Sequence, residues 1–168
     1  MERSEENFKP KSTEQFKEFS VPVEMDGLSC IFTGKISEID RDIQLSLLMP
    51  PTAASHMQEI GYVIASRPQG NEADLYIDKI RSHTDSLPED SEYKKVHVGR
   101  FLMNNLLAFA DTKGWKVMAF AQTDGRLSDQ DMYDWLERKG FPSPSKPGDM
   151  IREPQIPDLT QPITAILR

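Results

Sequence analysis

The feature that most constrains the fold of this 168-residue chain is a change in the spacing of its apolar side chains near position 98. Between residues 21 and 82, apolar and polar side chains alternate in short runs, which is typical of strands with one buried face. Further along, Val98, Leu102, Leu106 and Phe109 instead fall on one face of a helix. The sequence therefore predicts a group of strands followed by a helix with a buried stripe.

This helix is expected to end at Lys113-Gly114, because glycine is the usual residue just beyond a helix C-terminus. Residues 115–121 follow at once with the composition of a strand. A helix that leads through one glycine into a strand is half of a strand–helix–strand crossover. We therefore expect residues 115–121 to lie parallel to the strand that precedes the helix.

The alternating half of the chain is predicted to be an antiparallel meander. Asp26-Gly27 supplies the positive-φ positions that a tight turn requires. In the last strand of the meander, strict alternation would place Asp78 on the same face as Tyr76 and Ile80. The strands are expected at residues 28–35, 43–48, 62–65 and 75–80.

The end of the chain is predicted to hold a second helix and a last strand. Ser128 is a candidate N-cap followed by an acidic first turn, and the helix would run through Leu136 to Lys139-Gly140. Residues 142–162 are rich in proline and are expected to be irregular or extended. Residues 163–167 have the composition of a closing strand.

This order of elements predicts an α/β (α+β) fold with a mixed, mostly antiparallel sheet, a central parallel pair and helices on both faces. A chain of this length is enough for one domain with its own core. We divide it into an N-terminal polar segment, residues 1–20, and a single domain, residues 21–168, which includes the proline-rich loop 142–162. Within the first segment, residues 12–17 would form a short helix or part of a frayed end.

Composition excludes several classes of partner. The net charge of −7 repels phosphate backbones, so we expect no nucleic-acid partner, whereas an amine-bearing substrate, including a protein, is compatible with it. Neither a signal peptide nor a stretch of about 18 apolar residues is seen, so we expect a cytoplasmic location and no membrane partner. One cysteine, Cys30, and three scattered histidines give no disulfide and no metal-ligand spacing. The oligomeric state stays open, with a homodimer as one option.

The beginning of the long helix is a candidate anion site. Helix N-termini carry unpaired N–H groups and partial positive charge, which together favour a phosphate. Gly99 would let a ligand approach the backbone closely, and Lys94, Lys95 and Arg100 add positive charge in an acidic chain. The alternative is an ordinary helix start that is flanked by two solvated lysines.

Residues 88–103 resemble the signature of the GNAT acyl-CoA-dependent N-acetyltransferase superfamily, in which Gln/Arg-x-x-Gly-x-Gly/Ala opens a long helix. Lys94 stands at the Gln/Arg position, His97 at the first glycine and Gly99 at the second. Downstream, residues 135–141 resemble the Phe-Tyr-x-x-x-Gly-Phe ending of that family. The resemblance covers residues 74–141 together with a last strand.

The resemblance implies acetyl-CoA, or another acyl-CoA, as the cofactor and an amine of a protein, peptide or small molecule as the acceptor. The diphosphate would bind the backbone amides between Val96 and Arg100, and the pantetheine arm would run beside the end of the strand at Ile80 and Arg81. The implied cofactor-binding residues are Ile80, Arg81, Lys94, Lys95, Val96, His97, Val98, Gly99, Arg100 and Asp129.

The resemblance also implies two catalytic residues, a general base and a proton donor. The signal for the general base is weak, and the proton donor stands where the sequence departs from the family. Asp78 lies in the strand that supplies the general base in the family. Leu136 replaces the tyrosine that protonates the leaving thiolate, and Tyr133, three positions earlier on the helix, is the candidate substitute. His97 replaces a glycine, Asp129 an asparagine, and residues 36–42 are too few for the usual helical pair.

These departures leave two alternatives to an active transferase. In one, the chain is a catalytically silent GNAT-like module that binds a protein partner through the extended, proline-rich residues 142–162. In the other, CoA binds in a structural or sensing role without turnover. Cys30, on a predicted strand, is interpreted as a small core residue rather than a nucleophile.

Overall fold

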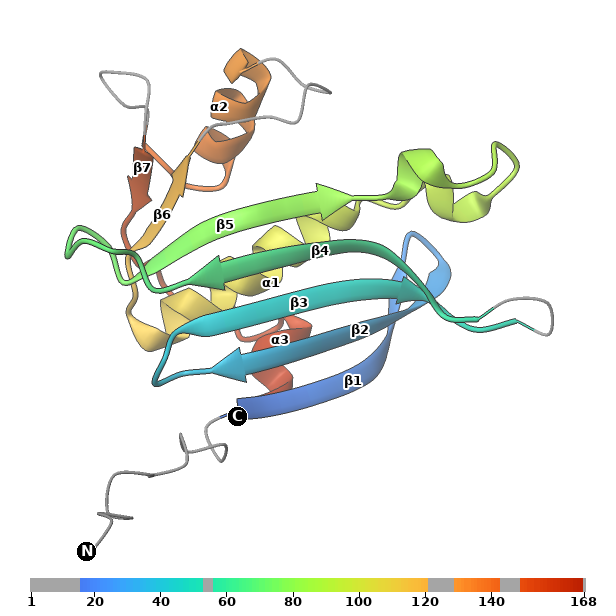
Figure 1. Cartoon of the computed structure of the whole chain (residues 1–168), viewed down its shortest axis with the longest axis horizontal. Coiled ribbons are helices and arrows are strands. Elements are labelled where there is room, and N and C mark those ends of the chain that lie inside the picture. Colours follow the sequence, from blue (N-terminus) through green and yellow to red (C-terminus); the bar gives the residue numbers. More distant parts are fainter. Residues whose placement is uncertain (1–15, 53–55, 121–128, 143–148, 168) are drawn as a thin grey trace, which may run out of the picture.

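The computed structural model describes residues 16–52, 56–120, 129–142 and 149–167, which form one seven-stranded sheet with helices packed against it (Figure 1). The strands lie across the sheet in chain order. They are β1 (Phe16–Met25), β2 (Leu28–Ser37), β3 (Asp42–Met49), β4 (Gln58–Ser66), β5 (Leu75–Ser82), β6 (Val117–Phe120) and β7 (Asp149–Arg152). The helices are α1 (Val98–Lys113), α2 (Asp129–Arg138) and α3 (Pro162–Ile166), with 3-10 turns η3 (Thr84–Ser86) and η4 (Glu92–Lys95).

The expected mixed sheet is confirmed. Strands β1 to β5 form an antiparallel meander, β5 and β6 are parallel, and β7 is antiparallel to β6. The β1–β2 turn has positive φ at both Asp26 (52°) and Gly27 (81°), as a two-residue hairpin of the primed type requires. The chain from β1 to β6 therefore follows the predicted order of elements.

The core lies between the sheet and α1. Phe32, Leu45, Leu47 and Val63 are fully buried on one face of the meander, and each contributes about 1.5–3 kcal/mol by leaving water. The buried stripe of α1 packs against β3, β4 and β5. In Figure 1, α1 and α3 both lie behind the sheet, and α2 stands at the end formed by β6 and β7.

Helix α1 ends as its sequence predicts. Gly114 is in the left-handed region (φ 68°), and its N–H donates to carbonyl oxygens of the last turn. Trp115 N–H donates to Ala110 O at 2.9 Å, which closes the turn as in a Schellman motif. The chain is thereby directed back into β6.

Both ends of the domain differ from the prediction. Strand β1 begins at Phe16, so residues 16–20 belong to the sheet rather than to a polar segment or helix, because Phe19 packs edge-on against Phe32 with ring centroids 5.0 Å apart. The expected strand at residues 163–167 is wrong, since Pro162 opens the short helix α3. A proline is well suited to a first helical position, and the Ile163 N–H donates to Asn105 Oδ1 at 3.2 Å.

The proline-rich loop is likewise not wholly irregular. Residues 149–152 form β7 and occupy the edge of the sheet beside β6. The candidate N-cap Ser128 lies outside the described residues.

A buried ion pair joins β7 to α1. The Arg152 guanidinium donates two parallel hydrogen bonds to Asp111, at 2.6 and 2.9 Å, and both side chains are nearly inaccessible to solvent. Arg152 Nε also donates to Lys139 O at 2.9 Å, just beyond α2. The pair therefore fixes α1, the end of α2 and β7 relative to one another.

We expect Asp111→Ala to lower the free energy of unfolding by about 3–5 kcal/mol, because it leaves the buried Arg152 charge without its partner. Urea denaturation measures the loss. Glu153→Gln is the control, since the exposed Lys116–Glu153 pair (3.6 Å) contributes at most about 1 kcal/mol. Equal losses from the two variants would contradict this role of the buried pair.

Candidate functional site

The candidate site opens where β5 leaves β6. Their parallel pairing extends from Leu75↔Val117 only to Ile77↔Ala119, and β5 then continues to Ser82. Within the described residues, the remainder of β5 is paired with β4 alone. The side of β5 that faces away from β4 is therefore a strand edge whose backbone groups face the gap.

A β-bulge stands at the point of separation. Ile64 pairs with Lys79 and Ala65 pairs with Ile77, so Asp78 is an extra residue in β5. A bulge bends its strand and increases the local twist, which carries β5 away from β6. It also reverses the alternation beyond it. Ile80 pairs with buried Val63 and packs against the core, so the prediction that Ile80 shares a face with Asp78 is wrong.

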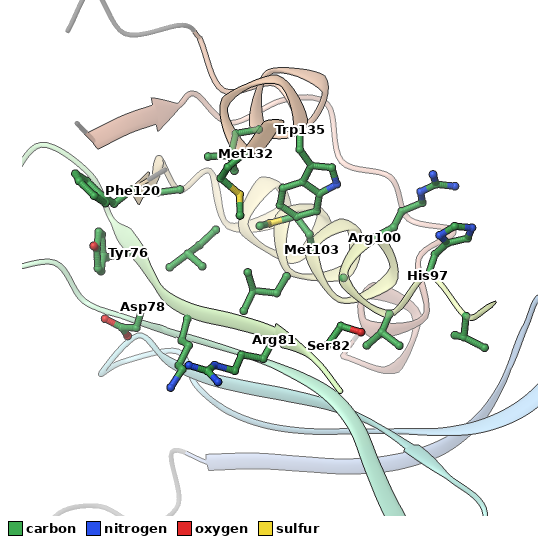
Figure 2. Close-up of a pocket in the computed structure, with 18 residues that line it drawn as sticks. Tyr76, Asp78, Arg81, Ser82, His97, Arg100, Met103, Phe120, Met132 and Trp135 are labelled. Carbon is green, nitrogen blue, oxygen red and sulfur yellow. The ribbon is translucent and has the colours of Figure 1, made fainter. Parts of the chain in front are cut away.

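The resulting cleft has a volume of about 760 Å³, within the range of small-molecule sites. Its walls come from β5, the turn before α1, the first turn of α1, the end of β6 and one face of α2 (Figure 2). The lining residues are Tyr76, Ile77, Asp78, Lys79, Ile80, Arg81, Ser82, Val96, His97, Val98, Gly99, Arg100, Met103, Ala119, Phe120, Met132, Trp135 and Leu136.

The first turn of α1 faces this cleft without a side-chain cap. His97 occupies the N-cap position and makes no capping hydrogen bond, and the first helical bond runs from Phe101 N–H to His97 O at 3.1 Å. The Val98 N–H donates to Val96 O at 3.0 Å. The N–H groups of Gly99 and Arg100 belong to the first turn, which has no intrahelical acceptor for them.

Two glycines shape this end of the cleft in opposite ways. A Cβ atom added to Gly99 would meet nothing within 4 Å, so there is open space above the turn. A Cβ atom added to Gly61 in β4 would overlap the Val98 side chain and lie 2.7 Å from Arg81 O. Gly61 therefore allows Val98, in the first turn of α1, to pack closely on β4 beside the end of β5.

Among the described residues of the lining, cationic side chains outnumber acidic ones although the chain is acidic. Lys79, Arg81 and Arg100 line the cleft together with His97, and Asp78 is the one acidic residue of the described lining. Behind Arg100, Lys139 Nζ donates to Asn104 Oδ1 at 2.8 Å, which ties the end of α2 to α1. Burial, followed by the charges of Arg100 and Arg138, lowers the pKa of Lys139.

Most of the residues predicted for the site are brought together by the fold. Of the predicted residues, eight line the cleft: Asp78, Ile80, Arg81, Val96, His97, Val98, Gly99 and Arg100. Lys94 and Lys95 lie outside the lining, in η4. The Lys94 ammonium is bound to Glu89 at 2.7 Å, and this hydrogen bond and charge lower the pKa of Glu89. Lys94 is therefore engaged by a carboxylate rather than directed at the cleft.

The remaining predicted residues lie on α2. Tyr133 is half-buried and is not among the lining residues. Asp129 begins the helix, and its side chain lies outside the described residues. The face of α2 toward the cleft is instead formed by Met132, Trp135 and Leu136, with the i, i+3, i+4 spacing of one helical face.

Several lining residues were not predicted from the sequence. The spacing of Met132, Trp135 and Leu136 was a readable signal for one wall of the cleft. Gly61, which lies next to the lining, was a second readable signal, because a glycine within an apolar strand often marks a close backbone approach. Tyr76 and Phe120 carried no such signal, since their place in the site depends on where β5 and β6 separate.

Other chemistries find little support in the described part of the chain. No group of three or more His, Cys, Asp or Glu residues there is arranged to hold a metal ion. Cys30 is buried, and burial together with the Asp26 charge raises its pKa to about 11, as expected for a core residue. None of the helices described has the length and apolar character of a membrane span.

Comparison of the chain with protein-family models, curated proteins and solved structures finds no match. The candidate function therefore depends on the geometry of the cleft.

We expect Gly61→Ala to lower stability by about 1–3 kcal/mol, because its methyl group forces Val98 or β5 to move, and to weaken any ligand bound at the first turn of α1. Gly70→Ala adds the same methyl group in open space and serves as the control. Thermal unfolding measures stability, and calorimetric titration measures binding. Wild-type behaviour of Gly61→Ala in both would contradict the close approach.

Proposed function

We propose that the cleft binds an acyl-CoA, with acetyl-CoA as the first candidate, and that the protein transfers the acyl group to an amine. The observation that carries this proposal is the coincidence of three features: a separated pair of parallel strands, an uncapped first turn of α1 and a cluster of cations. The proposal includes the cytoplasmic location expected from the sequence.

The first turn of α1 suits the diphosphate of CoA. The N–H groups of Gly99 and Arg100 can donate to phosphate oxygens, and the open space at Gly99 gives them access. Arg81, His97 and Arg100 supply side-chain donors in the same cleft. Charge-assisted hydrogen bonds of this kind contribute about 1.5–3 kcal/mol each.

The length of β5 beside the gap suits the pantetheine arm. From Ile77 to Arg81 the strand spans roughly 13 Å. The arm has about twelve bonds between its phosphate oxygen and its sulfur, which is a reach of roughly 15 Å when extended. A diphosphate at the first turn of α1 would therefore put the thioester near Ile77 and Asp78, where β5 and β6 part.

The walls of the cleft offer polar and apolar contacts to the pantetheine arm between its diphosphate and its thioester. Its two amides can pair with the free edge of β5, as an added strand would. Met103, Met132 and Trp135 form an apolar wall opposite β5 (Figure 2), and Leu136 also lines the cleft. Such a wall excludes water from the thioester and strengthens the hydrogen bonds around it.

In the proposed reaction, the amine nitrogen attacks the thioester carbonyl, the C–N bond forms and the C–S bond breaks. Asp78, the acidic residue of the lining, is placed to accept a proton from the amine. Backbone N–H groups at the separated edge of β5 can stabilise the oxyanion. The leaving thiolate then requires a proton. Tyr76 is the tyrosine of the described lining and can donate it. Tyr133 remains a prediction for this role.

The catalytically silent module remains the second candidate, and Leu136 at the position of the expected tyrosine favours it, since a leucine cannot protonate a thiolate. The open cleft favours the transferase, because a protein that binds only a partner has no need of a space that fits a thioester. Binding without turnover would instead support the sensing role.

We expect saturating acetyl-CoA to raise the melting temperature by roughly 5–10 °C, as about 100 Kd of ligand does in a domain of this size. Gly99→Glu should abolish the shift by placing a carboxylate at the diphosphate. Gly70→Glu, also at an open glycine, should retain it, and pantetheine, which lacks the diphosphate, should give a smaller shift. Acetyl-CoA binding that is unchanged in Gly99→Glu would contradict the diphosphate site.

Turnover can be followed by release of the CoA thiol, because Cys30 is the one cysteine of the chain and is buried. We expect Tyr76→Phe to lower kcat by about 10-fold or more if its hydroxyl protonates the thiolate. Tyr133→Phe, outside the lining, should have the smaller effect. A larger loss of kcat in Tyr133→Phe than in Tyr76→Phe would indicate that Tyr133 protonates the thiolate.

A further inference from the structure

The two ends of the cleft differ in chemistry. At the α1 end, Figure 2 shows His97 and Arg100 beside the first turn of the helix. At the opposite end it shows Tyr76 and Phe120 next to each other, with Asp78 below them. One end is thus suited to an anion, whereas the other combines a carboxylate with two aromatic rings.

The sheet fixes the arrangement at the aromatic end. Tyr76 pairs with Met118 and Ile77 with Ala119 in the parallel register, so the period of two puts Tyr76 and Phe120 on the same face of adjoining strands. The bulge follows at once and adds Asp78 to β5. Phe120 is 46% exposed although it is large and apolar, so its ring is accessible to a ligand that enters this end.

We propose that Tyr76, Asp78 and Phe120 form the acceptor site, and that it takes a primary monoamine with an apolar aromatic or aliphatic body. The ammonium group would pair with the Asp78 carboxylate and with the faces of the rings, which attract cations. The apolar body would pack against Phe120 and Met132, which both line this cleft.

Neighbouring charges restrict the acceptor to a single ammonium group. Lys79 and Arg81 follow Asp78 on the same strand and line the same cleft. A second ammonium on a polyamine would approach those cations and be repelled. An amino sugar would lose the water bound to its hydroxyl groups while gaining few polar partners from aromatic rings.

The acceptor site rests on the proposed acyl transfer, in which atoms and protons balance. A primary ammonium ion loses one proton to Asp78, directly or through water, before its nitrogen attacks the thioester carbon. The nitrogen loses a second proton as the amide forms and the C–S bond breaks. One of the two protons ends on the CoA thiol, and the other reaches solvent.

The test compares acceptors under saturating acetyl-CoA. 2-Phenylethylamine and hexylamine represent the proposed class, while spermidine and glucosamine represent the excluded classes. Thiol release gives the rates, and mass spectrometry identifies the acetylated amine. We expect kcat/KM to be at least roughly tenfold higher for the two monoamines.

Variants then separate recognition from folding. Phe120→Ala should raise the KM for 2-phenylethylamine roughly fivefold, and Asp78→Asn should reduce kcat/KM by more than tenfold. Phe16→Ala and Asp42→Asn, at exposed positions of β1 and β3 outside the cleft, are the matched controls and should behave as the wild type. Acetyl-CoA binding should be retained in all four variants.

Each outcome has a distinct meaning. Failure of the wild type to bind acetyl-CoA would refute the proposed function itself. Retained binding with faster acetylation of spermidine or glucosamine would overturn the acceptor site alone. Retained acetyl-CoA binding without any acetylated amine would also overturn the acceptor site. An unchanged KM for 2-phenylethylamine in Phe120→Ala would do the same.

Discussion

The architecture depends on the limited pairing of β5 with β6. Within the described residues, β5 is paired on both sides up to Ile77 and with β4 alone beyond it, so it presents a free edge there. The bulge at Asp78 bends the strand at that same point and turns this edge toward the cleft. Helix α1 begins beside this space because it must cross back from the end of β5 to β6. The cleft thus follows from one register shift in the sheet.

The wall opposite β5 is held by polar contacts that are remote from the cleft. Arg152 binds Asp111 on α1 and the carbonyl of Lys139 after α2, and Lys139 binds Asn104 on α1. A buried ion pair adds little net stability over an apolar contact, but losing one partner is costly. Its consequence here is geometric, because Arg152 ties the end of α2, the helix that carries Trp135 and Leu136, to α1 and β7.

The sequence predicted those parts of the molecule that local pattern determines. The change of period at Val98, the glycine at Gly114 and the parallel strand after it were all recoverable, and with them the position of the first turn of α1 in the wall of the cleft. The bulge was not, because the residues at Tyr76–Ile80 alternate in the sequence and only pairing with β4 reveals the extra residue. The helix at Pro162 was missed because its apolar residues resemble a strand, although a proline at the first position suits a helix and Ile163 N–H donates to Asn105 on α1.

Backbone amide NMR of the wild-type protein during titration with CoA is the most direct test of the site. We predict that the largest shifts occur at Gly99 and Arg100, with further shifts along β5 from Asp78 to Ser82, in the residues that border the gap. Shifts confined to surfaces away from the first turn of α1, or none at saturating CoA, would contradict the proposal that this cleft holds a CoA thioester.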